Sequence, residues 1–464
     1  MILPIRVNMK KDVKFIDLFS GMGGIRIGFE QAFQKNGIST ECVFTSEIKP
    51  HAIQVLEHNF EHKVFEGDIT KVVPDEIEDF DFLLAGFPCQ AFSAAGNRDG
   101  FCDTRGTLFF DVERILKVKK PYGFILENVE GLVKHDLEHK NDSIGRTLKT
   151  ILKTLEDLDY KVSWKVLDSK DFGLAQSRKR IYITGTKDSK INLNNLEHLP
   201  RKTFKDIQEK GLEVMETNFT KKLLAHYSPE ELHGKAIKDK RGGKNNIHSW
   251  QFGLKGEITD TQKLLLETLF KERRKKHWAE KIGIQWMDGM PLTLEHIKTF
   301  FSPNTLYEKD NNLYDMLEDL VAKGYLRYEH PKNIVKITLD DGSVITRREY
   351  DKTKEKGYNI VSGKLSFEFS KILDKNDLTP TLVASDMEKL GVVDGDGIRR
   401  LTLREGLRLF GYPDDYSLEM FNHSPSSRRK GFDLLGNTVA VPVIEQIANQ
   451  LVSAYRYKDT PVAV

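Results

Sequence analysis

The sequence predicts an α/β fold in which a doubly wound, mostly parallel sheet is interrupted by an inserted α+β domain. From about residue 14 to residue 185, short apolar runs alternate with amphipathic helical stretches, the pattern of parallel strands buried on both faces. The alternation then stops, charge density rises, and the earlier character returns near residue 376. We therefore expect a sheet domain in two pieces, 1–187 and 376–464, and a different domain at 188–375.

The expected elements follow from the spacing of the apolar residues. Six runs are typical of strands: FIDLF, ECVFTSE, FDFLLAGF, YGFILENV, KVSWKVLD and RIYITG. Helices are expected at 28–34, 109–117 and 144–158, and at 401–410 and 443–454 near the C-terminus. Ligands of open α/β sheets bind beyond the carboxyl ends of the strands. Residues that directly follow these runs are therefore the first candidates for a functional site.

Composition limits the classes of function. The chain has 464 residues, with 71 Lys and Arg against 69 Asp and Glu, so any nucleic-acid surface must be local. No run approaches the ~20 apolar residues needed to cross a bilayer, and the first residues lack the features of a secretory signal. Three cysteines in a chain of this length do not predict a disulfide framework. We expect a cytoplasmic protein without membrane association and without a metal site.

The segment FIDLFSGMGGIRIGFE is a strand, a glycine-rich turn and a helix, an arrangement that brings backbone close to a cofactor. Gly21, Gly23 and Gly24 supply the room, but their spacing is not GxGxxG, which disfavours a dinucleotide. Glu47 and Asp68 end the next two strand-like segments, where carboxylates can accept from ribose hydroxyls and from an adenine amino group. The segment indicates an adenosyl cofactor without phosphates. The alternative is a tight turn, with both acids serving as helix caps.

Cys89 in GFPCQAFSAAG directly follows a buried strand and precedes a small, polar stretch with the composition of a mobile lid. A lone cysteine is more often a small buried hydrophobe. Its place at a strand end favours a nucleophile here, whereas Cys42 and Cys102 lack that setting. Glu127 ends the next strand, and Arg178 and Arg180, two apart, point the same way in extended chain. A nucleophile, an acid and two cations at one sheet edge predict a catalytic site.

Six segments in this order resemble the motifs of cytosine C5 DNA methyltransferases of bacterial restriction-modification systems: FIDLFSGMGG, GFPCQAFS, ENVEGL, QSRKRIYI, RLTLREGLRLFGYP and GNTVAVPVI. The resemblance covers about residues 15–185 and 378–454. It implies a Rossmann-like, S-adenosylmethionine-dependent methyltransferase fold whose C-terminal helix packs beside the first strand. It also implies S-adenosylhomocysteine as the product, and the interrupting domain as the part that recognises the target.

By this resemblance, Cys89 adds to C6 of a flipped-out cytosine, Glu127 hydrogen-bonds or protonates N3, and Arg178 and Arg180 contact O2 and the neighbouring phosphate. A base from solution removes the C5 proton. Ala95 departs from relatives that carry a serine there, which leaves open how the lid fills the space of the flipped base. The implied cofactor residues are Phe19, Gly21, Gly23, Gly24, Glu47, Asp68, Ile69, Pro88, Leu108, Asn437 and Val439.

The middle region contains basic runs with interspersed aromatic residues, which suit contact with double-stranded DNA at a short specific site. RGGKNNIHSW, with Arg241 and Lys244, is the better candidate for reading bases, and the lid residues Gln90 and Ser93 are expected to contact DNA too. KERRKKHW fits a DNA-binding segment and a solvated helix face equally well. Helices at 259–276, 292–301 and 305–323 precede a hairpin with an Asp-Gly turn, which resembles a winged-helix insertion at about 258–350. The alternative, which we prefer, is a helical extension that does not touch DNA.

Three other functions are compatible with parts of the sequence. An RNA cytosine C5 methyltransferase on the same fold is the main alternative, but the Cys-Phe-Thr signature of that relative is absent. A DNA-binding protein without catalysis is disfavoured by the presence of Cys89 and Glu127, and a dehydrogenase by the glycine spacing. No obligatory protein partner is evident, although a cognate restriction endonuclease would fit a restriction-modification system. The recognition sequence and the oligomeric state do not follow from the sequence.

Overall fold

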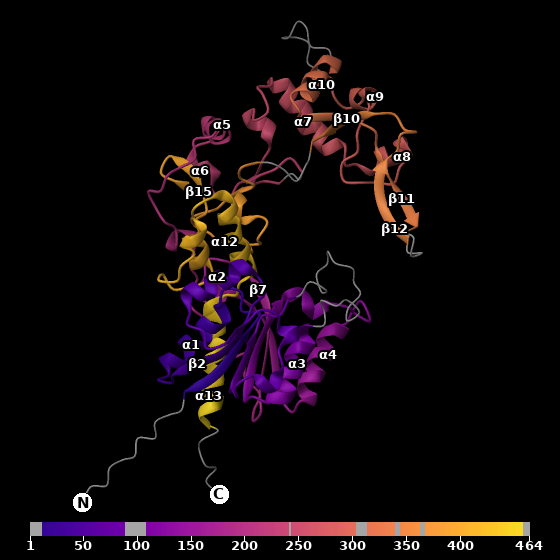
Figure 1. Ribbon diagram of the computed structural model, residues 1–464. Helices are drawn as coiled ribbons and strands as arrows, with labels where there is room; N and C mark the ends of the chain where they lie inside the picture. Colours follow the sequence, from indigo (N-terminus) through magenta and orange to yellow (C-terminus); the bar gives the residue numbers. More distant parts are fainter. Residues whose placement is uncertain are drawn as a thin grey trace, which may run out of the picture. The chain divides into compact units, whose positions relative to one another are not determined.

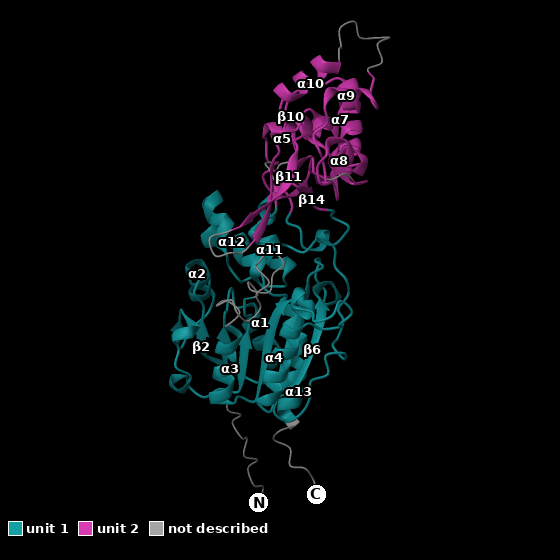
Figure 2. Ribbon diagram, turned by 90° about the vertical axis from the view of Figure 1, so that its right-hand side faces the viewer, with its two compact units in different colours: residues 1–209, 374–388, 401–464 teal, residues 210–373, 389–400 magenta. Residues whose placement is uncertain are grey.

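The computed structural model describes residues 12–88, 108–240, 243–302, 313–338, 344–361 and 367–457. The chain divides into two compact units (Figure 2): unit 1 comprises 1–209, 374–388 and 401–464, and unit 2 comprises 210–373 and 389–400. The expected boundaries were at 188 and 376. Residues 389–400 differ from the expectation because they form strands that pair within the sheet of unit 2.

Unit 1 is built on a seven-stranded sheet of order β3-β2-β1-β4-β5-β7-β6. Pairing is parallel from β3 to β5, and β7 is antiparallel to both β5 and β6. The expected α/β fold with a mostly parallel sheet is therefore confirmed, and β3 is the one strand that the apolar runs did not indicate. The strands are β1 Val13–Leu18, β2 Thr40–Ser46, β3 Phe65–Glu66, β4 Phe82–Ala85, β5 Gly123–Val129, β6 Lys161–Asp168 and β7 Lys179–Thr186.

Helices cover both faces of this sheet because successive residues of each strand point to opposite sides (Figure 1). On one side, Phe15 of β1 packs in a core with Phe29 of α1 (Gly24–Lys35) and Ile444 of α13 (Val441–Tyr457). On the other side, Ile16 belongs to a core with Val112 of α3 (Leu108–Lys119) and with residues of α4 (Arg146–Asp157). The C-terminal helix thus lies beside the first helix and shares a core with the first strand. The remaining helices of unit 1 are α2 Pro50–Asn59, α11 Leu403–Leu409 and α12 Pro425–Asn437.

Unit 2 contains a five-stranded sheet of order β16-β15-β14-β8-β9. Its core holds Phe219, Phe252 and Phe369. The strands are β8 Ala236–Ile237, β9 Asn246–Ile247, β14 Lys371–Ile372, β15 Leu390–Asp394 and β16 Gly397–Arg400, and the nearby helices are α5 Asn218–His226 and α6 Pro229–Leu232.

A helical portion of unit 2 has a separate core that includes Trp250, Leu269 and Leu317. The helix expected at 259–276 is present as α7 but ends at Glu272, where the chain turns and buries the Arg273 side chain, and a further helix begins at Lys276. β10 pairs with β13, whereas β11 and β12 pair as a separate two-stranded sheet. These elements are α7 Asp260–Glu272, α8 Lys276–Ile282, α9 Leu294–Lys298, α10 Leu313–Ala322, β10 Leu326–Glu329, β11 Lys332–Thr338, β12 Val344–Tyr350 and β13 Gly357–Ile360.

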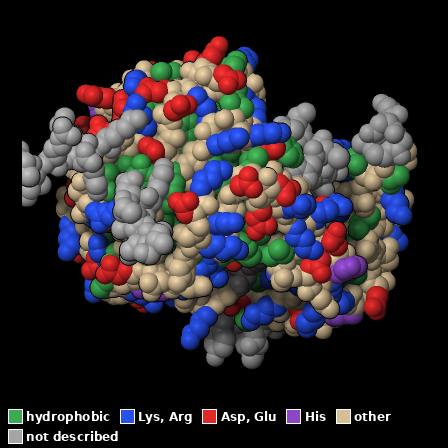
Figure 3. All heavy atoms as spheres, turned by 90° about the horizontal axis from the view of Figure 1, so that it is seen from below, with side chains coloured by type: hydrophobic (Ala, Val, Ile, Leu, Met, Phe, Trp, Pro, Cys, Tyr) green, Lys and Arg blue, Asp and Glu red, His purple; other side chains and the backbone are tan. Residues whose placement is uncertain are grey.

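Charge is distributed as the balanced composition predicts. On the face shown in Figure 3, lysine and arginine side chains are interspersed with aspartate and glutamate. A surface that attracts a polyanion must therefore be sought in a particular element. Among the helices that the structure describes, none combines the length and apolar character needed to cross a bilayer.

Candidate active site

Most of the residues singled out from the sequence line one cavity of about 610 Å³ in unit 1. It opens at the carboxyl ends of β1, β2, β4 and β5, where an open α/β sheet binds its ligands. The predicted residues in its wall are Phe19, Gly21, Gly24, Glu47, Asp68, Ile69, Pro88, Leu108, Glu127, Arg178, Arg180, Asn437 and Val439. The wall also includes residues for which the sequence analysis expected no individual role: Ser20, Met22, Ser46, Ile48, Lys49 and Thr438.

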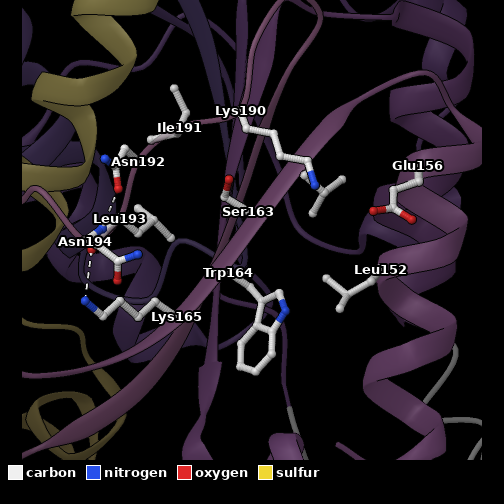
Figure 4. A pocket seen from close by; sticks show the side chains of 11 residues that line it. Leu152, Glu156, Ser163, Trp164, Lys165, Lys190, Ile191, Asn192, Leu193 and Asn194 are labelled. Carbon is white, nitrogen blue, oxygen red and sulfur yellow. Dashed lines mark hydrogen bonds between the residues drawn. The ribbon is translucent and has the colours of Figure 1, made fainter.

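A second cavity, of about 340 Å³, lies against the edge strand β6 (Figure 4). Trp164 of β6, Glu156 of α4 and Lys190 contribute to its wall. Lys165 Nζ already donates to the Leu193 carbonyl, 3.2 Å away. None of the predicted site residues lines this cavity, so the cavity at the strand ends is the candidate active site.

Some predicted residues fall elsewhere. Cys89, Gln90, Ser93 and Arg241 lie outside the described residues. Pro88, the last residue before Cys89, lines the cavity. The chain is therefore followed to within one residue of the proposed nucleophile.

Gly23 does not line the cavity and has a different reason to be glycine. Its φ is +70°, and a Cβ there would lie 2.5 Å from the Phe60 ring, so the position serves the packing of α1 against neighbouring chain. Gly24 lines the cavity, but a Cβ there would also lie 2.6 Å from the Tyr412 hydroxyl and 2.9 Å from Val439. The glycine turn therefore lets the 438–439 segment, far away in sequence, approach the first helix.

Glu47 joins the glycine turn to the end of β2. Its Oε2 accepts from the Gly21 N–H at 2.8 Å, and its Oε1 accepts from the N–H groups of Ile48 and Lys49 at 2.9 and 2.8 Å. Glu47 therefore caps the turn that leads into α2, although the N-cap of that helix is Lys49. A carboxylate has about four acceptor sites, so these three bonds leave capacity for a ligand hydroxyl. Phe19 adjoins this turn in a left-handed conformation (φ 53°), which is uncommon for a residue with a side chain.

Asp68 also acts as a cap. Its Oδ1 accepts from the Thr70 N–H at 3.1 Å and from the Thr70 hydroxyl at 2.7 Å. These bonds lower the pKa of the Asp68 carboxyl below its ordinary value, so the group is a carboxylate and an acceptor at neutral pH. Capping and lining the cavity are compatible for both acids. The wall therefore suits the adenosine part of the expected cofactor, whose hydroxyl and amino groups need acceptors.

Glu127 and Arg180 form an ion pair in the cavity wall, with 3.2 Å between Glu127 Oε1 and Arg180 Nε. The Glu127 side chain is only 12% exposed. Burial raises the pKa of this carboxyl, and Arg180 and Arg178 oppose that shift. In its protonated form, a carboxyl with a raised pKa next to a fixed cation can donate a hydrogen bond to a ring nitrogen.

Asn128, next to Glu127, ties the acid to the segment that leads to Cys89. Its Nδ2 donates to the Phe87 carbonyl at 3.2 Å, and its Oδ1 accepts from the Val129 N–H at 2.8 Å. The amide is 2% exposed. Two neighbouring strand ends are thus held together at the point where the acid and the proposed nucleophile should meet.

Arg178 is arranged differently from Arg180. Its guanidinium is buried and donates to the carbonyls of Leu382, Gly436 and Thr438 at 2.9, 3.0 and 2.9 Å. Burial and the nearby Arg180 lower its pKa to about 9, which leaves it charged at neutral pH. Both terminal nitrogens are thus committed to backbone. Alternation along a strand predicts that Arg178 and Arg180 point the same way, but their partners differ. The spacing of two residues does not reveal which backbone segment faces each side chain.

A buried acid beneath the glycine turn was not anticipated. Asp17 sits in the first strand with 1% exposure, and within the described part of the chain neither carboxylate oxygen has a hydrogen-bond partner. Burial raises its pKa to about 7, and Arg26 opposes that shift. The apolar run FIDLF gave no signal for this site.

The basic run KERRKKHW of unit 2 is largely structural. Arg273 is 2% exposed and its Nη1 donates to Asn359 Oδ1 at 2.6 Å. Arg274 pairs with Asp288 at 3.1 Å, and Lys275, in the connection between α7 and α8, pairs with Glu272 at 2.5 Å. The run is therefore not one continuous solvated helix face, because α7 ends at Glu272, Arg273 is buried and α8 begins at Lys276.

Lys244 is exposed in the turn between β8 and β9. The base of this turn is fixed, because Asp239 accepts from both the Ser249 N–H at 2.8 Å and the Ser249 hydroxyl at 2.7 Å. His248 stacks on the buried Trp250 ring with 4.2 Å between centroids. Of the described residues of RGGKNNIHSW, Gly243, Lys244 and Asn245 are therefore the exposed ones.

Comparison with known proteins identifies the family. The family model described as "C-5 cytosine-specific DNA methylase" matches residues 13–453. The Type II methyltransferase M.NlaIV of Neisseria lactamica is 58% identical over 441 residues, which are 95% of this chain and 99% of that protein. M.NgoBV of Neisseria gonorrhoeae is 57% identical over 95% of this chain and 99% of that protein. M.BanI of Aneurinibacillus aneurinilyticus is 39% identical over 95% of each chain.

A solved structure agrees at the level of the fold. The Entamoeba histolytica methyltransferase EhMeth superimposes with a TM-score of 0.51 at 15% identity, covering 96% of this chain and 99% of that chain. At this identity the likeness concerns the fold alone.

Proposed function

We propose that this protein methylates a flipped-out cytosine through a covalent bond from Cys89 to C6. The chain belongs to the C-5 cytosine-specific DNA methylase family and is a DNA cytosine-5-methyltransferase of the type II restriction-modification kind. The observation that carries this proposal is the convergence of two chemistries on one cavity. Glu127, Arg180 and Pro88 line the same wall as the glycine turn, Glu47 and Asp68.

S-adenosylmethionine, the methyl donor of this family, fits the acceptors of the wall. Glu47 would accept from the ribose hydroxyls and Asp68 from the adenine amino group, while Phe19 and Val439 offer apolar surface. The other residues proposed to hold it are Gly21, Gly24, Ile69, Pro88, Leu108 and Asn437. Gly23 would act indirectly, through the packing of α1. The cofactor supplies an electrophilic methyl group and leaves as S-adenosylhomocysteine.

The proposed reaction uses the protein to make C5 of cytosine nucleophilic. The Cys89 thiolate forms a bond to C6, and Glu127 holds or donates a proton at N3 so that negative charge does not accumulate on the ring. C5 then takes the methyl group, a base from solution removes the C5 proton, and the bond between Cys89 and C6 breaks. Arg180 would contact the base O2, and its ion pair fixes Glu127. Arg178 would act one step away, by holding the 436–438 segment in the wall.

The target base must leave the helix for this chemistry, because C5 and C6 are not reachable from either face in a stacked duplex. Extrusion costs a few kcal/mol, which contacts to the base and the phosphates offset. We propose double-stranded DNA with a short specific site as the substrate, contacted by Gln90, Ser93, Arg241 and Lys244. Protection against a cognate endonuclease is the biological role that such an activity would serve. The RNA alternative is not retained, since the family model and the relatives at 57–58% identity are named for DNA methylation or type II modification.

The proposal is tested by methyl transfer and by mapping its product. The full chain is incubated with labelled S-adenosylmethionine and, separately, with duplex DNA and transfer RNA, and DNA from expressing cells is sequenced after bisulfite treatment. We expect label in DNA alone and one protected cytosine in a short recurring sequence. Label in transfer RNA, or methylation at a ring nitrogen or exocyclic amine, would refute it.

A further inference from the structure

The β11–β12 hairpin pairs with no other described strand of unit 2, and it is joined to the segment after α8 by two hydrogen bonds, from Arg348 to the Trp286 carbonyl at 3.4 Å and from the Gln285 N–H to Asn333 at 3.2 Å. Its two strands of seven residues each pair only with one another, and none of these residues is buried. In Figure 1 the two arrows extend beyond the helices that surround β10. A two-stranded ribbon with no buried face gains little stability in water by itself. Its apolar members Val335 (39% exposed) and Val344 (59%) remain accessible, which is the condition of a surface that meets a partner.

The pairing register assigns the side chains to two unlike faces. Directly paired residues of an antiparallel ladder lie on the same face. The face that we call the basic face consists of Lys332, Ile334, Lys336, Thr338, Val344, Thr346, Arg348 and Tyr350. The opposite face consists of Asn333, Val335, Ile337, Ile345, Arg347 and Glu349. Three cations and no carboxylate occupy the first face, whereas the second carries one of each sign.

The basic face is anchored at one end and accessible along its middle. Lys332 Nζ lies 4.6 Å from the centre of the Tyr350 ring, and the Tyr350 hydroxyl donates to Glu329 at 2.8 Å. Lys336 pairs directly with Thr346 farther along the ribbon, and both are exposed. The cations therefore follow the ribbon in a row. This differs from the run at 271–277, where Arg273 is buried and its neighbours are paired with acids.

We propose that the basic face of the β11–β12 hairpin lies in the major groove of the duplex that this enzyme methylates. The inference rests on the proposed function for its partner and adds the element that holds it. A major groove about 12 Å wide admits a two-stranded ribbon, and seven extended residues span roughly 20 Å, enough to follow the groove. Lys336 and Arg348 meet phosphates or guanine edges, and the Thr346 hydroxyl can bond to any base edge.

This proposal reverses the earlier preference for an extension that does not touch DNA. It uses the two strands alone: the aspartates that the sequence places between them, Asp340 and Asp341, lie outside the described residues. Charge complementarity indicates which partner the basic face binds. A face with three cations and no carboxylate suits a polyanion better than a protein surface on which acidic and basic side chains are mixed.

The test compares the two faces in the full-length protein. Lys336→Ala/Arg348→Ala removes two cations from the basic face, and Arg347→Ala is the matched control from the opposite face. Dissociation constants for a defined 30-base-pair duplex are measured between 50 and 200 mM salt, together with single-turnover methyl transfer at saturating DNA. We expect the double variant to bind on the order of tenfold more weakly, with a salt slope reduced by about 2, since each phosphate contact contributes about 0.9. Arg347→Ala should change the slope by less than half of that amount.

The outcomes separate this inference from the proposed function. If the wild-type protein transfers methyl groups and the double variant keeps the wild-type slope and affinity, the hairpin does not hold DNA and the inference is overturned. It is equally overturned if the substitution changes the sedimentation of the DNA-free protein, which would make the hairpin a contact between copies. Failure of the wild-type protein to methylate any duplex would count against the proposed function instead. A wild-type rate of transfer at saturating DNA, combined with the weaker binding, supports the inference.

Discussion

The cavity of unit 1 and the hairpin of unit 2 use charged side chains in opposite ways. In the cavity, Glu127 and Arg180 are nearly buried and paired with each other, so each acts mainly on the other and on whatever binds beside them. On the hairpin, Lys336 and Arg348 are exposed in a row, so each shares its task with others. A buried pair in a wall of low dielectric acts strongly on one atom, whereas exposed cations are screened by salt and substitute for one another. Effects of substitution should therefore decrease from the cavity to the surface.

The largest expected effect is at the proposed nucleophile. Cys89→Ser should abolish methyl transfer while leaving DNA binding close to normal, because a serine hydroxyl is not ionised at neutral pH and adds poorly to C6. A duplex with 5-fluorocytosine at the target should trap the unmodified enzyme covalently, since fluorine cannot be removed as a proton is. Mass mapping of the adduct checks the assignment. An adduct at Cys42 or Cys102, or none, would remove Cys89 from the mechanism.

Glu127→Gln should come next, with a loss of about 10²–10⁴-fold in the chemical step, the usual range for general acid catalysis. Burial raises the pKa of this carboxyl, so its proton is present below that pKa and is lost as the pH rises through it. The rate of the unmodified enzyme should therefore fall on the alkaline side, and that decline should be absent in the variant. Single-turnover rates across pH measure this. A loss confined to cofactor affinity would mark Glu127 as a structural residue.

Unit 1 shows how much of the fold and of the site the sequence predicts. Apolar runs revealed six of the seven strands of unit 1, and motif order placed Glu127, Arg180, Glu47 and Asp68 at one edge. They succeed because parallel strands bring their carboxyl ends together whatever lies between them. The same reasoning also placed Arg178 at this edge, but it did not foresee that its partners are carbonyls more than 200 residues away. No local pattern records which distant backbone faces a side chain.

Unit 2 was harder to anticipate for a related reason. The run KERRKKHW and the strand VITRREY are both basic in sequence, but Arg273 is buried against Asn359 while Arg348 is exposed. Composition cannot distinguish these fates, because burial depends on which elements pack nearby. The place of residues 389–400 also depends on which elements pack nearby. They belong to unit 2 because β15 pairs with β14 and β16 pairs with β15.

The third prediction separates the two arginines of the cavity by stability. Arg178→Met removes the donors of three carbonyls, and a buried carbonyl left without a donor costs about 1–3 kcal/mol, so the free energy of unfolding of unit 1 should fall by several kcal/mol. Arg180→Met should destabilise less, because Arg180 donates to one carbonyl, that of Lys179, and Glu127 can take up a proton when its cation is lost. Its rate of methyl transfer should fall sharply. Scanning calorimetry and single-turnover assays measure the two effects. Equal stability of both variants would contradict the structural role of Arg178.

The smallest expected effect is at Lys244, which tests whether the β8–β9 turn shares the work of the hairpin. The residue is exposed, and the turn is held at its base by Asp239 and Ser249, so truncation should not disturb the fold. If Lys244 contacts a phosphate, Lys244→Ala should lower the salt slope by about 1 for every duplex tested; a base contact would instead cost ~1–3 kcal/mol at one position of the site only. Lys298→Ala, an exposed lysine of α9 paired with Glu295, is the control and should change neither. Normal binding and normal sequence choice in Lys244→Ala would contradict a contact between this turn and DNA and leave the hairpin as the principal contact of unit 2. Removing a cation that touches the duplex lowers the affinity and the salt slope, even if only slightly, whereas removing a cation that lies away from the duplex changes neither.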